Sequence, residues 1–144
     1  RPGLENLEDV WLKRLPNEPM VIALPANHAL ARQQTVRLAD ISGEPFILFP
    51  RTVGLSLYDD IVFACRTAGF ELNVTQEAPQ IPSVVNLVAA ELGVSIVPRS
   101  IAQIRLDGVA YRPIEGPPLV ARLALAFMRG HRSPVAGNLL DALK

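Results

Sequence analysis

The stretch IPSVVNLVAAELGVSIVP, residues 81–98, changes its hydrophobic period in the middle. Its first half places apolar side chains at helical spacing, and Pro82 suits the first position of a helix. Gly93 can adopt the left-handed conformation that ends a helix, and the VSIVP after it predicts a buried strand that stops at Pro98. Helices joined in this way to apolar strands cover parallel sheets, so the stretch predicts an α/β fold.

Composition predicts a globular protein for which neither DNA nor a bilayer is an obvious partner. The 144 residues are 49% hydrophobic, and 14 basic residues balance 14 acidic ones. No apolar run reaches the length of a membrane span. A single cysteine, Cys65, and the lack of a secretory leader pattern at the start indicate a reducing cytoplasm.

The chain alternates strands and helices on both sides of the opening stretch. A buried strand is expected at 20–25 and further strands at 46–50 and 72–78, with a helix from about Leu57 to Ala68 between the last two. Together with 81–98 they predict one compact α/β lobe. The later elements expected are a short helix at 99–106, strands at 109–114 and 119–130, and a terminal helix at 133–144 with Ser133 as its cap.

Four segments carry a resemblance: PMVIALPANHALA, VRLADISGEPFILFP, LYDDIVFACRTAGFELNVTQEA and VVNLVAAELGVSIVP. They resemble the effector-binding domain of LysR-type transcriptional regulators, in particular the branch that senses aromatic-catabolism acids such as muconate and benzoate. The resemblance implies a fold like that of periplasmic binding proteins, with two α/β lobes joined by crossing strands. Residues 20–110 would be the complete second lobe, and 1–19 and 111–144 parts of an incomplete first lobe.

The resemblance also implies partners. The family's domains bind a small organic acid as effector and self-associate as dimers, or as tetramers in the full-length protein. The family's proteins bind DNA through an N-terminal helix-turn-helix that has no counterpart in these residues. Two positions depart from the family pattern: Ala29 stands where proline is usual, and Glu91 stands where glycine is usual. Both replacements favour helix, and Glu91 bears on any close backbone approach that the glycine serves.

The turn RTVGLS, between the strand at 46–50 and the next helix, is the candidate ligand site. Ligands of open α/β sheets bind where strands end and helix N-termini present free N–H groups to anions. The resemblance places the effector at this same turn. The candidate ligand-binding residues here are Arg51, Thr52, Leu55, Ser56 and Leu57. Leu123 and Ala124 are added because the resemblance places the family's returning strand, which lines the cleft, near them.

A purely structural interpretation of the turn remains open. Ser56 could cap the helix in an S-x-x-D pattern with Asp59, which would leave Thr52 as an ordinary loop residue. Asp59 and Asp60 in the first helical turn would also repel a carboxylate, unless Arg51 compensates.

Catalytic and metal sites are not expected. His28 and His131 are far apart in the chain, no metal-ligand spacing is present, and Cys65 lies on the apolar face of its helix. No serine or cysteine occupies a nucleophile elbow, so no catalytic residue and no cofactor is assigned. The function expected is ligand sensing for transcription control. A free-standing solute-binding protein of periplasmic type is the alternative, and a small α/β enzyme is a third hypothesis.

Overall fold

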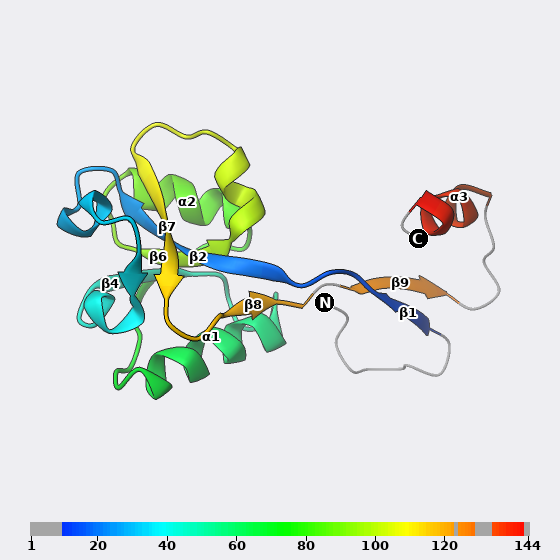
Figure 1. The fold of residues 1–144 in the computed structure, drawn as a ribbon, viewed down its shortest axis with the longest axis horizontal. Coiled ribbons are helices and arrows are strands. Elements are labelled where there is room, and N and C mark those ends of the chain that lie inside the picture. The colour runs from blue at the N-terminus through cyan, green and yellow to red at the C-terminus, as the bar shows by residue number, and fades with distance from the viewer. Residues whose placement is uncertain (1–9, 123, 129–133, 143–144) are drawn as a thin grey trace. The chain divides into compact units, whose positions relative to one another are not determined.

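The computed structural model describes residues 10–122, 124–128 and 134–142, and the chain divides into two compact units (Figure 1). Unit 1 is Arg1–Pro16 with Leu123–Lys144, and unit 2 is Asn17–Arg122. The lobe boundary expected after residue 110 falls inside a strand of unit 2. Residues 111–122 therefore belong to unit 2 and not to the return into the other unit.

Unit 2 is a mixed sheet with one helix on each face. Its elements are β2 (Glu18–Pro25), η2 (Ala29–Arg32), β3 (Val36–Arg37), η3 (Leu38–Ile41), β4 (Pro45–Leu48), α1 (Leu55–Thr67), β5 (Asn73–Glu77), α2 (Ile81–Ala89), β6 (Ser95–Pro98), η4 (Arg99–Gln103), β7 (Val109–Glu115) and β8 (Val120–Ala121). The strands follow the order β5-β4-β6-β2-β7-β3, with β4 and β6 joined at a parallel bridge between Phe46 and Val94. The α/β fold expected from the sequence is confirmed, and the sheet is mixed, because β2 runs antiparallel to both of its neighbours.

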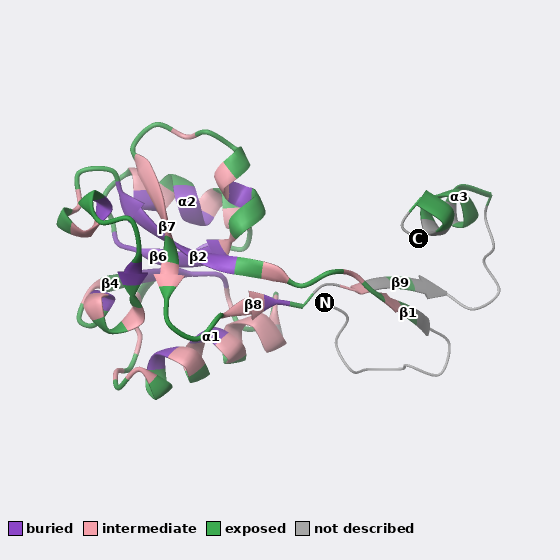
Figure 2. Ribbon diagram, in the orientation of Figure 1, coloured by how far each residue is buried: buried purple, intermediate pink, exposed green. Residues whose placement is uncertain are grey.

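Strand β2 lies at the centre of the sheet and is buried on both faces (Figure 2). Val21 and Ala23 pack into the cluster that holds the apolar side of α2. Ile22 and Leu24 point the other way, into the cluster that holds Ile61 and other core residues of α1. Strands covered on both faces are continuously apolar, which explains the uninterrupted run MVIAL in the sequence.

The opening stretch forms α2 and β6 as predicted, but its two special backbone positions exchange roles. Glu91, and not Gly93, is left-handed, with φ 64°. The Glu91 N–H donates to the Val88 carbonyl, and the Leu92 N–H donates to the Leu87 carbonyl. These two hydrogen bonds close the helix. Gly93 is needed for space instead, since a Cβ there would lie only 3.0 Å from the carbonyl carbon of Pro45.

In unit 1, β1 (Val10–Arg14) pairs antiparallel with β9 (Ala124–Met128), and α3 spans Pro134–Ala142. The single strand expected over 119–130 is therefore two strands, because β8 pairs with β2 in unit 2 while β9 pairs in unit 1. The cap expected at Ser133 lies outside the described residues. No helix in the described part of the chain has the length and apolarity to cross a membrane.

Candidate functional site

The candidate turn leaves the carboxyl end of β4 and leads into α1. A turn closes where the Val53 N–H donates to the Pro50 carbonyl at 2.9 Å. Gly54 is the N-cap residue, and its carbonyl accepts the first helical hydrogen bond, from the Tyr58 N–H, at 2.9 Å. The ring of Phe49 lies under Gly54 and meets Tyr58 edge to face at 6.3 Å, which fixes the start of the helix against the core.

Ser56 does not cap this helix, so the expected S-x-x-D cap is wrong. Helix α1 begins at Leu55, one residue before Ser56, and no side chain caps it. The N–H groups of Leu55, Ser56 and Leu57 come too early in the helix to have intrahelical acceptors. Thr52 is exposed and Ser56 half-buried. The turn thus brings together all five predicted residues of segment 51–57.

Arg51 is paired with an aspartate of the helix. Its guanidinium donates to both Asp59 oxygens, at 2.9 and 3.0 Å. These bonds hold the pKa of the Asp59 carboxyl below its ordinary value, although both side chains are at least half exposed. Asp59 is the fifth residue of α1, not part of its first turn as expected. Arg51 therefore compensates the charge of Asp59, one of the two aspartates expected to repel a carboxylate, and this pair carries little net charge.

Two predicted site residues remain, Leu123 and Ala124. Leu123 is outside the described residues. Ala124 belongs to unit 1, where it pairs with Arg14 in the β1–β9 ladder. Cys65 is fully buried in the core under α1, and burial raises the pKa of its thiol to about 11. Within the described ranges, no group of three His, Cys, Asp or Glu side chains could hold a metal ion.

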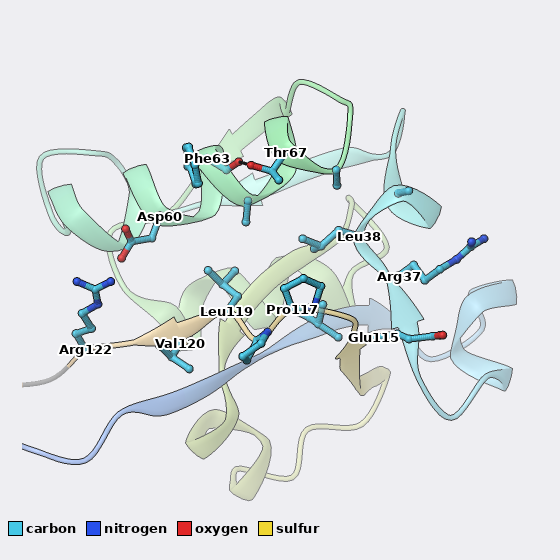
Figure 3. Close-up of a pocket in the computed structure, with 15 residues that line it drawn as sticks. Arg37, Leu38, Asp60, Phe63, Thr67, Glu115, Pro117, Leu119, Val120 and Arg122 are labelled. Atoms are coloured by element: carbon cyan, nitrogen blue, oxygen red, sulfur yellow. Dashed lines mark hydrogen bonds between the residues drawn. The ribbon is translucent and has the colours of Figure 1, made fainter.

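A groove beside α1 is a second feature of unit 2, which the sequence reasoning missed (Figure 3). It encloses about 510 Å³ between α1 and the connection from β7 to β8. Phe63 stands on its wall with 73% of its surface exposed, opposite Leu119 and Val120. Phe63 lies off the face formed by Leu57, Ile61 and Cys65, and that unexplained apolar position was the available signal.

The two ends of the groove are charged. Figure 3 shows Asp60 and Arg122 at one end and Arg37 and Glu115 at the other. Arg37 also pairs with Asp40 at 3.0 Å. An apolar floor with charges of both signs at its ends is typical of a protein contact surface rather than of an enzyme cleft.

Known proteins resemble the chain along its whole length. A regulator of Escherichia coli strain K12, the uncharacterized HTH-type transcriptional regulator YnfL, is 36% identical over 133 residues, which cover 89% of this chain. The chain spans only 45% of that relative. The effector-binding domain of QuiR with shikimate is 27% identical, with a TM-score of 0.77 over 98% of this chain and 67% of that one.

The BenM effector-binding domain with benzoate has a TM-score of 0.79 at 23% identity, over 99% of this chain and 65% of that one, which shows the same fold. The model of the LysR substrate binding domain matches residues 1–144. These matches favour the regulator over the free-standing solute-binding protein, and the relatives are transcriptional regulators rather than enzymes. The chain belongs to the LysR substrate-binding domain family.

Proposed function

We propose that this chain is the effector-sensing part of a longer LysR-type regulator and binds a small organic acid at the turn 51–57. The observation that carries the proposal is the N-terminus of α1 at the end of β4, where the N–H groups of three residues precede Tyr58, whose N–H is the first to donate a helical hydrogen bond. The hydroxyls of Thr52 and Ser56 add donors beside them.

The surroundings of the turn suit an anion with an apolar body. Because Arg51 neutralises Asp59, the Asp59 carboxylate does not repel an anionic ligand. Val53 is 55% exposed next to Thr52 and offers apolar contact area. Neutral donors beside an apolar side chain match a carboxylate attached to a hydrocarbon ring or chain.

Within the class of small organic acids, we propose an aromatic-pathway compound such as muconate or benzoate. Support comes from the sequence resemblance and from BenM with benzoate and QuiR with shikimate, both of which are named with carboxylates. Leu123 and Ala124 are proposed as further contacts on the returning strand.

Calorimetry on the intact regulator tests this site with benzoate, muconate and shikimate as probes. Thr52→Ala and Ser56→Ala should each weaken the binding of the best probe about tenfold, since each removes a hydrogen bond to a charged group. Thr75→Ala is the matched control, because Thr75 is an exposed hydroxyl on β5 and should leave the affinity unchanged. Unchanged affinity in both turn variants would reject the site.

A second copy of the chain is the proposed occupant of the groove on α1. An exposed phenylalanine above an apolar floor is costly in water, and burial against a copy removes that cost. The opposite charges at the two ends favour an antiparallel, two-fold arrangement. The contact would use α1 and first-lobe elements such as α3, where Val135 is 76% exposed.

Sedimentation of the intact protein at several concentrations tests this contact. Phe63→Ser should weaken self-association by about thirtyfold, as expected for a central aromatic anchor. Ile104→Ser is the control, because Ile104 is 56% exposed and outside the groove. If each variant self-associates as strongly as the wild type does, the groove is excluded as the interface.

DNA binding is assigned to a helix-turn-helix outside these residues, and the regulator is placed in the cytoplasm. The chain has a formal net charge of zero, which gives little attraction to phosphates. A mobility shift with the 144-residue chain alone should show no sequence-dependent complex at low salt. A salt-sensitive complex that discriminates between sequences would overturn this assignment.

A further inference from the structure

Three consecutive residues after β2 each bond to a different loop. The Ala26 N–H donates to the Gly108 carbonyl at 2.8 Å. The Asn27 amide donates to the Glu91 carboxylate just beyond α2. The His28 Nε2 lies 2.7 Å from the Glu44 carboxylate, in the turn before β4. Segment 26–28 therefore touches three loops that are far apart in the sequence.

The histidine contact is well defined by its second nitrogen. The His28 Nδ1 accepts the Leu30 N–H at 3.1 Å and so caps η2. The neutral tautomer with its proton on Nε2 satisfies both contacts at once, because Nε2–H then donates to Glu44. The cap fixes the direction in which the imidazole reaches the Glu44 loop.

Glu91 occupies an unfavourable backbone position for its side chain. Its φ of 64° is the only positive value among the non-glycine residues that the structure describes. Glycine adopts this conformation without steric cost, whereas a side chain is strained there. Helix closure alone therefore gives no reason for glutamate. The hydrogen bond that a glycine would lose is the one from the Asn27 side-chain amide.

We infer that segment 26–28 is a staple that makes the three loops open as one unit, and that Glu91 is a positioning residue for it. The Gly108 loop is already close to the end of α2, since a Cβ on Gly108 would lie 3.4 Å from the Ala89 carbonyl oxygen. The Asn27 bond thus closes a ring of contacts that runs from β2 through α2 to the turn before β7. Losing it frees the segment at its middle residue.

Amide hydrogen exchange in the intact chain, followed by NMR, tests the staple with Glu91→Gly. This variant relieves the strained backbone and should raise the thermal midpoint, which slows exchange at the core amide of Ile22. The Ala26 amide should instead exchange about three- to tenfold faster, because the staple has lost one hydrogen bond. The two amides are therefore expected to change in opposite directions.

Two further variants separate the staple from helix closure. Glu91→Gln keeps an acceptor oxygen at the same reach and should leave Ala26 exchange as in the wild type. Asn27→Ala should speed Ala26 exchange in the wild type but add nothing in the Glu91→Gly background. The inference is overturned if Glu91→Gly slows Ala26 and Ile22 in parallel, or if Asn27→Ala has the same effect in both backgrounds.

Discussion

Gly93→Ala is expected to damage the sheet between β4 and β6 directly. The added Cβ would lie 3.0 Å from the Pro45 carbonyl carbon and 3.3 Å from a side-chain carbon of Ile47, and closer still to the Pro45 oxygen. Two hydrogen bonds cross this contact, from Val94 N–H to Pro45 at 2.9 Å and from Ile47 N–H to Val94 at 2.8 Å. Relief of the clash must therefore move one strand away from the other.

The expected loss follows from these contacts. Overpacking against backbone costs about 1–3 kcal/mol, and weakening two hydrogen bonds adds about 1–2 kcal/mol. The lower entropy of the unfolded alanine variant offsets about 0.4–1 kcal/mol. The free energy of unfolding should fall by about 1–5 kcal/mol, which a urea titration followed by circular dichroism measures.

Gly43→Ala is the matched control. Gly43 has φ +80°, and a Cβ added there would have no other atom within 4 Å, so its replacement costs only backbone strain, about 1–2 kcal/mol. If Gly93→Ala destabilises by less than Gly43→Ala, the close approach to Pro45 does not limit residue 93, and the reasoning about the strand contact fails.

Three other substitutions test local features. Ala29→Pro should raise unfolding free energy by about 0.4–1 kcal/mol, since His28 already has φ −63° and ψ 142°; a lower melting temperature would contradict this. Tyr111→Phe should raise the free energy of unfolding, measured by urea titration, by about 1 kcal/mol, because the buried hydroxyl has no partner among the described residues. Stability should fall by about 2–3 kcal/mol from pH 9.0 to about 11 as the unfolded Cys65 thiol ionises first, and Cys65→Ala should lack that component.

The sequence predicted the elements better than the reasons for them. The change of period in residues 81–98 located α2 and β6, because it depends on local spacing. It could not show which residue is left-handed. Gly93 is required because the backbone of Pro45 leaves no room for a Cβ, and Pro45 is distant in the sequence. A glycine required for space and one required for a turn look alike in a sequence.

The candidate turn shows the same limit. Its position between strand and helix was predictable, but the S-x-x-D pattern misplaced the cap because Asp59 turns instead to Arg51. The groove escaped notice because Leu119 and Val120 looked like part of one long strand. The pairing of Val120 with β2, rather than with β1, is decided by non-local register.

The central position of β2 has a consequence for how unit 2 folds. Residues 18–25 lie near the start of the unit, yet both neighbours of β2 come from its end, β6 at 95–98 and β7 at 109–115. Because such distant pairings form slowly, β2 must wait for most of the chain to be synthesised before it finds partners. Until then its apolar run is exposed, so slow refolding and aggregation of nascent chains are expected for this domain.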